Sequence, residues 1–350
     1  MKFSQKQILI FSVIILSIIL GLFIWQIINL INTKTTIPII KSIPTIIPTP
    51  TPDPDRPISI LLLGYGGGTH DGGSLTDSIM VAQVRPHDQK INLISIPRDL
   101  WINVSTDSAV PKFAKINYLY PSTDSITTKS KVGEILGINI DYYLALDFNG
   151  FTKAIDQLGG IDLKIVKNWQ DPWYPLDIGT TDTCNKSPDD IKAIEATMSG
   201  DILAQQYTCR YETLNFSIGT THLDGITALK YARSRHSPTD GGDFNRGLRQ
   251  RQVIIAIRDK IINPNNLTKI FPIIKTLKYH LYTDITTSDI EKYLLKVYEF
   301  SKYKTESYAL TDKNVLMIST SNRQSILIPT SGINQYDAIK SYVASISAKL

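Results

Sequence analysis

The segment DSIMVAQVRPHDQKINLISIP, residues 77–97, decides the fold class of this 350-residue chain. Its two strand-like runs, 77–84 and 91–97, are separated by the short polar turn RPHDQK. Because that turn is too short to house a crossover helix, the two strands are expected to form an antiparallel hairpin. Strands and helices alternate elsewhere, and the hairpin interrupts their alternation. The sequence therefore predicts an α/β fold with a mixed sheet covered by helices.

The patterns on either side of the hairpin extend this prediction. The apolar run ISILLLG, residues 58–64, ends in glycine and is typical of a buried strand. Helical spacing predicts one helix in residues 149–160 and another in residues 288–300, the latter capped by Ser288 or Asp289. Further strands are predicted at residues 141–148, 161–166 and 325–329.

A single domain accounts for residues 58–348, because no second linker, internal repeat or low-complexity run divides them. Its core spans residues 58–265. The C-terminal part, residues 266–348, keeps the same alternation of strands and helices and is expected to complete the domain. Residues 167–217 are rich in loop-forming residues and are interpreted as an insertion near one rim.

A membrane anchor is predicted ahead of this domain. The uncharged apolar run at residues 8–31 is longer than the roughly 20 residues that a helix needs to cross a bilayer. Lys2 and Lys6 precede it, so the positive-inside bias predicts a cytoplasmic tail at residues 1–7 and an extracytoplasmic domain. A cleaved signal peptide is the alternative, but its apolar run usually has roughly 7–15 residues, and no A-x-A-like site follows here. A single-pass protein of the cell membrane is favoured.

The predicted extracytoplasmic position has two further consequences. Residues 32–57 carry repeated prolines, which predict an extended linker between anchor and domain. Cys184 and Cys209, the only cysteines, both fall outside the membrane. A disulfide between them is favoured over two free thiols, because that compartment permits oxidation. Their spacing resembles no metal site.

The charge of the chain argues against a nucleic-acid partner. A formal net charge of +5 is too small to indicate one, and the residues before Ile8 are too few for a DNA-binding module. Positive charge is instead concentrated in YARSRHSPTDGGDFNRGLRQRQ, residues 231–252. This segment holds five arginines: Arg233, Arg235, Arg246, Arg249 and Arg251.

Backbone geometry divides these arginines. A short helix capped by Asp224 is expected to end near Ala232, which leaves Arg233 and Arg235 two residues apart on one face of an extended segment. A turn and a cap in DGGDF are then expected to start a second helix near Phe244.

The phase of this second helix separates inward from outward side chains. Arg251 and Arg258 lie on the side opposite the apolar stripe and are expected to face water, and Arg249 lies at the border. Arg246 and Gln250 continue the inward stripe formed by Val253, Ile257 and Ile261.

An inward arginine is costly to bury unless an anion meets it. Helix N-termini favour phosphate, and guanidinium groups bind phosphate oxygens in bidentate fashion. The alternative is that the arginines form structural ion pairs with Asp240, Asp243 or Asp99. For Arg233, Arg235 and Arg246 together, whose side chains are expected to converge, phosphate binding is favoured.

Arg98 and Asp77 form a second candidate cluster. Arg98 follows the strand-ending SIP, where ligand contacts are common, and Asp77 opens the neighbouring strand. Asp77 is either an ion-pair partner of the arginines or a ligand of a divalent cation, and the second interpretation is favoured. His70 and Asp71 lie in the loop GYGGGTHDGG, which lacks a P-loop pattern and is either a mobile loop at the edge of the site or merely flexible.

Eight separated motifs occur in an order that resembles the LytR-CpsA-Psr family of bacterial cell-wall enzymes. They are ILLLG, LTDSIMV, SIPRD, KIN, DYYLALDF, LGGID, LDGITALKYARSRH and DFNRGLRQRQ. The resemblance implies a three-layer α-β-α sandwich with a hydrophobic pocket for a polyprenyl chain. It also implies Mg²⁺ or Mn²⁺ as cofactor.

The resemblance also implies roles for individual residues. Arg98, Arg233, Arg235, Arg246 and Gln250 correspond to pyrophosphate-binding residues. Asp77 corresponds to a metal ligand, and Asp77 and Arg98 are the implied catalytic residues. The family's usual Asp and Arg are replaced here by Gly66 and Leu75, and Asp71 is a candidate to supply the missing acid at the metal.

The implied activity is transfer of a glycan phosphate from an undecaprenyl-pyrophosphate carrier to peptidoglycan. Its partners are the lipid-linked donor, the peptidoglycan acceptor and the membrane lipid. Two alternatives stay open: a polyprenyl-pyrophosphate hydrolase, and a non-catalytic protein that binds polyprenyl lipid or cell wall. The general base is Asp77 or a metal-bound hydroxide.

Overall fold

A computed structural model describes residues 56–68, 72–105, 110–176, 182–199, 202–203 and 205–348. The chain divides into two units, Met1–Pro52 and Asp53–Leu350, and every described residue belongs to the second. The predicted cytoplasmic tail, the predicted membrane helix at residues 8–31 and nearly all of the predicted linker lie outside these ranges. Within the described ranges, no helix has the length and apolarity of a membrane span.

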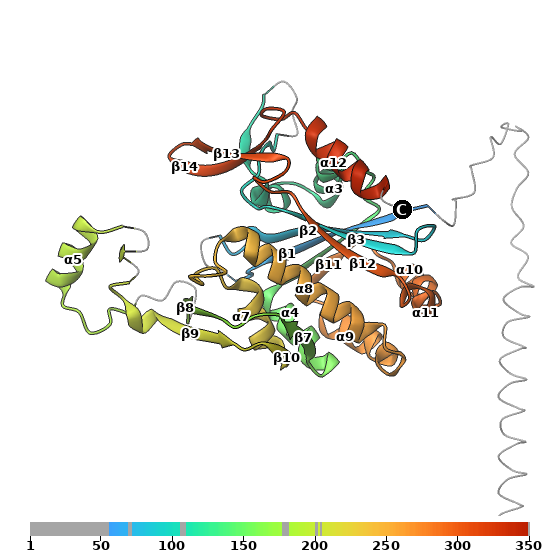
Figure 1. Cartoon of the computed structure of the whole chain (residues 1–350), viewed down its shortest axis with the longest axis horizontal. Coiled ribbons are helices and arrows are strands. Elements are labelled where there is room, and N and C mark those ends of the chain that lie inside the picture. Colours follow the sequence, from blue (N-terminus) through green and yellow to red (C-terminus); the bar gives the residue numbers. More distant parts are fainter. Residues whose placement is uncertain are drawn as a thin grey trace, which may run out of the picture. The chain divides into compact units, whose positions relative to one another are not determined.

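The central element is a six-stranded sheet with the order β11-β6-β1-β2-β3-β12 (Figure 1). β1 pairs antiparallel with β2 and parallel with β6, and β3 pairs parallel with β12, so the sheet is mixed as predicted. The predicted hairpin is confirmed, because β2 and β3 pair antiparallel from Arg85 opposite Lys90 to Ile79 opposite Ile96. The strands are β1 Ile58–Tyr65, β2 Thr76–Arg85, β3 Lys90–Ile96, β6 Tyr142–Asp147, β11 Leu281–Thr283 and β12 Lys304–Ala309.

The two faces of β1 serve different purposes. Leu61 and Leu63 are buried against the helices α3 (Ser125–Leu136) and α12 (Asp337–Ala348), which cover one side of the sheet. Leu62, from the opposite face, is only partly buried, because it borders a cavity. Side chains alternate across a strand, so a continuous apolar run supplies both a core and a cavity wall.

The second helical layer consists of α4 (Phe148–Leu158), α7 (Gly225–Arg233) and α8 (Asp243–Ile261). Figure 1 shows it on the side of the sheet opposite α3 and α12, which gives three layers. Gly225 is required where α7 crosses α4, since a Cβ there would lie 2.2 Å from the carbonyl oxygen of Thr152. The helix predicted to start near Phe244 is α8, but its N-cap is Gly242, which offers no side-chain cap.

The region 167–217 is more regular than predicted. It contains β8 (Trp169–Pro175), α5 (Pro188–Thr197) and β9 (Tyr211–Phe216), and β8 and β9 pair antiparallel. The predicted disulfide between Cys184 and Cys209 is present and spans 25 residues of sequence. A loop of that length gives a stabilisation of about 3.5 kcal/mol in the chain-entropy treatment of disulfides.

The remaining elements complete the domain around the sheet. The helix predicted at residues 288–300 is split into α10 and α11. The N-cap of α10 is Thr286 and not Ser288 or Asp289, and Asp289 is the N3 residue of a capping box with Thr286. The strand predicted at residues 325–329 is β14. The strands outside the central sheet and the β8–β9 pair are β4 Trp101–Asn103, β5 Phe113–Lys115, β7 Ile161–Ile165, β10 Gly219–Leu223, β13 Leu316–Ser321 and β14 Gln324–Pro329. The other helices are η1 Ile116–Tyr118, α2 Leu119–Ser122, η2 Thr208–Arg210, η3 Pro264–Lys269, α9 Ile270–Thr276, α10 Thr287–Leu294 and α11 Val297–Phe300.

A first prediction concerns the cap of α7, the helix that ends at Arg233. The Asp224 carboxylate accepts a hydrogen bond from the Thr227 backbone N–H at 2.7 Å. Asp224→Ala should destabilise the protein by about 1 kcal/mol, because that N–H loses its partner. Thermal unfolding of the full chain measures this as a decrease in Tm of about 2 °C. Asp224→Asn is the matched control, since asparagine caps equally well, and a loss of the same size in both variants would contradict the capping role.

Candidate active site

A cavity of about 290 Å³ lies between the sheet and the helices α4, α7 and α8. One part of its wall is apolar and comes from the sheet and all three helices. The main apolar residues are Leu62, Leu144, Leu146, Phe148, Phe151, Leu229, Val253 and Ile254. The other part is polar and carries most of the residues predicted from the sequence. The polar residues are Asp77, Ser78, Arg98, Arg233, Arg235, His236, Arg246 and Gln250.

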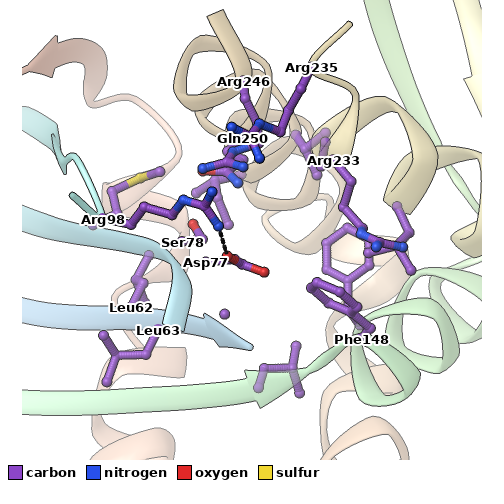
Figure 2. A pocket seen from close by; sticks show the side chains of 18 of the residues that line it. Leu62, Leu63, Asp77, Ser78, Arg98, Phe148, Arg233, Arg235, Arg246 and Gln250 are labelled. Atoms are coloured by element: carbon purple, nitrogen blue, oxygen red, sulfur yellow. Dashed lines mark hydrogen bonds and ion pairs between the residues drawn. The ribbon is translucent and has the colours of Figure 1, made fainter. Parts of the chain in front are cut away.

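Three separate segments bring the predicted arginines to this cavity (Figure 2). Arg98 follows β3, Arg233 is the last residue of α7, and Arg235 lies two residues further on. Arg246 and Gln250 occupy the first turns of α8, in the inward phase that the sequence predicts. The predicted convergence of these side chains is therefore present, and their binding of pyrophosphate stays a prediction.

Asp243 is the carboxylate shared by two of the arginines. Its Oδ1 lies 3.0 Å from Nε of Arg235 and 3.1 Å from a terminal nitrogen of Arg246. Burial tends to raise the pKa of Asp243, but the charges of Arg246, Arg235 and Arg98 outweigh burial, and the pKa is lowered. The carboxylate is therefore charged at neutral pH. The sequence offered Asp243 as a structural partner of the arginines, and this pairing is present.

Asp99 and Asp240 pair mainly with other cations. Asp99 lies 2.6 Å from Nζ of Lys115 and only 3.8 Å from Nε of Arg98, and Asp240 lies 3.0 Å from Nζ of Lys167. Four arginines, at positions 98, 233, 235 and 246, thus share two carboxylates, Asp77 and Asp243, which leaves two positive charges in excess. Such an excess favours an anionic ligand.

Arg246 and Arg233 show how the guanidinium groups are held. Arg246 is 7% exposed, and burial lowers its pKa to about 10, a shift that the charge of Asp243 opposes. Arg233 stacks on the ring of Phe148 at 4.6 Å and donates a hydrogen bond to the hydroxyl of Tyr174 at 3.1 Å. Among the described residues, no carboxylate lies within 4.0 Å of the Arg233 guanidinium. Arg233 is therefore positioned by aromatic contacts and keeps its charge available.

Asp77 is held by Arg98, whose NH1 lies 2.6 Å from Oδ1. Burial tends to lower the pKa of Arg98, but Asp77 and Asp243 outweigh it, so the pKa is raised. Figure 2 shows the second carboxylate oxygen of Asp77 directed into the cavity. The other predicted metal ligand, Asp71, lies outside the described residues. Within the described ranges, the only cluster of metal-ligating groups is Asp182 with the two disulfide cysteines, which is not part of this cavity.

The predictions for two further arginines, Arg251 and Arg258, are wrong. Arg251, predicted to face water, is 7% exposed and donates hydrogen bonds to the hydroxyl groups of Ser95, at 2.9 Å, and Ser307. The physical reason is that α8 packs against β3 and β12 on the side that the helical phase marks as outward. Arg258, also predicted outward, donates to the carbonyl oxygens of Tyr303 and Phe300. Phase alone identifies the polar side of a helix, but not what covers it.

Comparison with known proteins places this site in a family. The sequence model of the LytR_cpsA_psr family matches residues 32–336. This chain belongs to the LytR_cpsA_psr family. Two curated relatives of this chain are named polyisoprenyl-teichoic acid–peptidoglycan teichoic acid transferases. TagV of Bacillus subtilis is 27% identical over 75% of this chain and 58% of its own length, and TagU of Enterococcus faecalis is 25% identical over 69% and 65%. The matched region thus spans less than two thirds of either relative.

Solved structures support the fold of this LytR_cpsA_psr protein. The crystal structure of B. subtilis TagV superposes with a TM-score of 0.57 at 25% identity, and the match covers 83% of this chain and 97% of TagV. TagT bound to LIIa-WTA gives a TM-score of 0.56 at 19% identity, over 84% of this chain and 91% of TagT. The mixed sheet and its helical layers are therefore the family's fold.

Sequence reasoning missed the residue that organises the arginine loop of this LytR_cpsA_psr protein. Asp171, in β8, is fully buried. One carboxylate oxygen accepts hydrogen bonds from the Ser234 hydroxyl at 2.6 Å and from the backbone N–H groups of Arg235 and His236 at 3.0 and 3.1 Å. The other accepts from the N–H of Trp173 at 3.0 Å. The signal was an aspartate at an inward position of an otherwise apolar strand face, which is unfavourable unless it is fully hydrogen-bonded.

Arg249 supports the same loop from α8. Its guanidinium donates to the carbonyl oxygens of Ser234 and Asp240 and stacks over the ring of Trp169 at 4.8 Å. Arg249, placed by its phase at the border of the stripe, is 3% exposed and binds the backbone, not the cavity. Asp171 and Arg249 together fix both ends of the segment 234–240.

We expect Asp171→Asn to disorder this loop. The Asp171 carboxylate accepts hydrogen bonds from N–H and O–H donors, and asparagine would place its NH₂ group, itself a donor, against some of them. The free energy of unfolding should therefore fall by about 3 kcal/mol at neutral pH. Burial tends to raise the pKa of Asp171, but the hydrogen bonds from Ser234, His236, Trp173 and Arg235 outweigh it and the pKa is lowered. Its contribution is therefore complete above an unfolded-state pKa of about 3.9 and is lost as the pH falls through the lower folded value.

Denaturant unfolding of wild type and Asp171→Asn from pH 7 down to pH 3 tests this expectation. The difference in unfolding free energy between wild type and Asp171→Asn should be smaller near pH 3 than at pH 7. Amide hydrogen exchange at residues 234–242 should be faster in the variant than in wild type. Asp162→Asn, in an exposed carboxylate of β7, is the control and should leave that exchange unchanged. Equal exchange in wild type and Asp171→Asn would refute the organising role.

Proposed function

We propose that this chain transfers a glycan phosphate from a polyprenyl-pyrophosphate-linked glycopolymer precursor to peptidoglycan. The observation that carries the proposal is the two-part cavity, in which an apolar wall adjoins arginines with an uncompensated positive charge. A polyprenyl pyrophosphate likewise has an apolar part, the polyprenyl chain, joined to an anionic part, the pyrophosphate. The activity for which TagV and TagU are named, transfer of teichoic acid from a polyisoprenyl carrier to peptidoglycan, supports the same conclusion.

The size of the cavity limits how the donor binds. A volume of about 290 Å³ is at the lower end of the range for pockets that enclose drug-sized ligands. It therefore holds the first part of a polyprenyl chain, and the rest of the lipid lies outside the domain. The predicted anchor at residues 8–31 would keep the domain beside the membrane in which that lipid is dissolved.

The reaction follows from the position of the arginines. The oxygen of an acceptor hydroxyl attacks the phosphorus on the glycan side and its proton passes to the Asp77 carboxylate, while the P–O bond to the second phosphate breaks and polyprenyl phosphate leaves. Charge grows on the departing phosphate during this step, and Arg98, Arg235 and Arg246 are already in place to stabilise it. Arg233 lies beside the apolar ring of Phe148, where it can contact the same departing phosphate from the lipid side. No nucleotide is consumed, because the donor contains its own phosphoanhydride.

The described residues of the cavity offer one carboxylate, Asp77, that could hold a divalent cation. Mg²⁺ is commonly bound by one or two carboxylates together with substrate phosphate oxygens. Asp77 supplies one carboxylate, held in position by Arg98, with an oxygen directed into the cavity. Asp77 would therefore hold Mg²⁺ or Mn²⁺ jointly with the donor. When bound, such a cation would neutralise charge on the phosphate oxygens and polarise the reacting phosphorus.

Arg246→Ala should reduce transfer at least about 100-fold, because it removes a buried charge-assisted contact to the phosphates. The assay uses the full chain in detergent with a lipid-linked glycan donor and peptidoglycan. Arg323→Gln, in the exposed turn between β13 and β14, is the matched control and should retain wild-type rates. Mass spectrometry of lipid that co-purifies should find polyprenyl phosphate or pyrophosphate with wild type and none with Arg246→Ala.

The product distinguishes transfer from the alternatives. Wall-linked glycan phosphate supports transfer, whereas free glycan phosphate would establish a hydrolase. Donor binding without turnover, in the presence of Mg²⁺, would establish a non-catalytic binding protein.

Metal removal provides a separate prediction. Chelation with EDTA should abolish transfer, and added Mg²⁺ or Mn²⁺ should restore it. Asp77→Asn keeps a side chain of the same size but weakens cation binding, so the Mg²⁺ concentration for half-maximal rate should rise at least about tenfold. Asp182→Asn, an exposed carboxylate outside the cavity, should not change that concentration. Full activity of wild type in EDTA would rule out the metal.

A further inference from the structure

An open groove of about 580 Å³ lies beside the cavity, and nothing described so far uses it. Its walls come from β8, β9, the disulfide-closed segment between them and the loop that leads into α8. The side chains that characterise it are Trp173, Gln205, Tyr211, Ser237, Thr239 and Asn245.

The groove and the cavity meet at two residues. Arg235 and His236 line both, so a ligand in the groove comes within reach of groups that face the phosphates. The backbone N–H groups of these two residues are fixed by the buried carboxylate of Asp171. The junction is therefore a rigid part of the site.

The lining of the groove fits an uncharged sugar polymer. The rings of Trp173 and Tyr211 meet edge to face, 5.7 Å apart at 80°, and both are partly exposed. Rings of this kind pack against the apolar C–H faces of sugars, while amide and hydroxyl groups bond to sugar hydroxyls. Among the described residues there, Arg235 is the only guanidinium and no carboxylate lines the groove. A polyanion would need more cations, and a lipid would need a mainly apolar wall.

We propose that this groove binds the acceptor glycan strand, an inference that rests on the transfer proposed above. Attacking and leaving oxygens lie roughly in line in phosphoryl transfer. The leaving polyprenyl phosphate occupies the apolar cavity, so the acceptor hydroxyl must approach from the opposite side of the phosphorus. The groove continues from the cavity on the side of Arg235 and His236 and supplies that approach.

The disulfide restrains the segment that contributes Gln205 to the groove lining. Gln205 lies between Cys184 and Cys209, and the disulfide joins the two ends of that segment. Arg210 reinforces the closure, because its Nε donates to the carbonyl oxygen of Asp182 at 2.6 Å and its guanidinium stacks on Tyr207 at 3.8 Å. The predicted insertion is therefore part of the binding surface.

Steady-state transfer rates of the full chain in detergent test the assignment, with the lipid-linked donor and soluble uncross-linked peptidoglycan oligomers varied separately. Trp173→Ala should raise the KM for the oligomers about tenfold and leave the KM for the donor within about twofold. Tyr298→Ala, which removes a 74% exposed ring far from the groove in sequence, is the matched control and should change neither. An unchanged KM for the oligomers would overturn the proposal. A rise in the donor KM alone would also overturn it, since it assigns the groove to the donor's glycan.

Gln205→Ala and Thr239→Ala protect the test against misfolding, because both residues are exposed and contribute only at the groove surface. Each should raise the KM for the oligomers several-fold with the Tm unchanged. The Cys184→Ser, Cys209→Ser double variant should also raise that KM, because Gln205 loses its fixed position, and its Tm should fall because the stabilisation by the disulfide is lost. The proposal would be overturned if none of these variants changed the KM for the oligomers and if Trp173→Ala were folded and also had a wild-type KM.

Direct binding separates the failure of this inference from failure of the proposed function. Chitotetraose should change the intrinsic tryptophan fluorescence of wild type and of Arg246→Ala equally, and that of Trp173→Phe much less. A chain that binds chitotetraose through Trp173 but never transfers glycan would refute the function and leave the glycan groove intact. Transfer that proceeds normally without Trp173-dependent binding would refute the groove alone.

Discussion

Positive charge that the protein only partly neutralises is the constraint on which this structure depends. Arg246 is 7% exposed, and its partner Asp243 is shared with Arg235, while Asp77 is engaged by Arg98. A buried cation without a full complement of anions is unfavourable, so the fold must hold these groups in place by other contacts. These other contacts keep the arginine cluster folded, and a bound anion would stabilise it further by neutralising the excess positive charge. The same imbalance that costs stability in the free protein therefore favours the binding of an anion.

The restraint comes from groups that never face the cavity. Asp171 accepts hydrogen bonds from the segment 234–236, and Arg249 binds the carbonyl oxygens at both ends of the loop. These two opposite charges are each satisfied mainly by backbone and hydroxyl groups, and they fix a loop that would otherwise yield to repulsion among the arginines. Buried hydrogen bonds restrict the motion of the loop backbone and so keep the charged side chains of the site in place before a ligand binds. Asp171 therefore controls the shape of both the cavity and the groove.

Local patterns predicted much of this, and non-local contacts account for what they missed. The six-residue turn between residues 85 and 90 was enough to predict the hairpin, and the phase of α8 was enough to turn Arg246 and Gln250 inward. Arg251 was misplaced because Ser95 and Ser307, which bind it, belong to distant strands that cover the opposite side of the helix. Asp171 was missed for the same reason, since its partners at residues 234–236 are more than 60 positions away. Sequence periodicity gives the direction of a side chain, whereas its role depends on what tertiary packing places there.

The arrangement of the sheet explains why lipid, phosphate and glycan can meet at one point. β1 uses Leu61 and Leu63 for the core, so Leu62 on its other face is free to border the apolar cavity. The strand ends at Tyr65, and its Gly64 lines the cavity together with Asp77 and Arg98, where the backbone leaves the sheet and polar groups can gather. Beyond Arg235 and His236 the lining changes again, to aromatic rings, amides and hydroxyls. The order of the three surfaces along the domain is the order of the three chemical parts that the proposed transfer would bring together, and it would place the reacting phosphorus at the arginines.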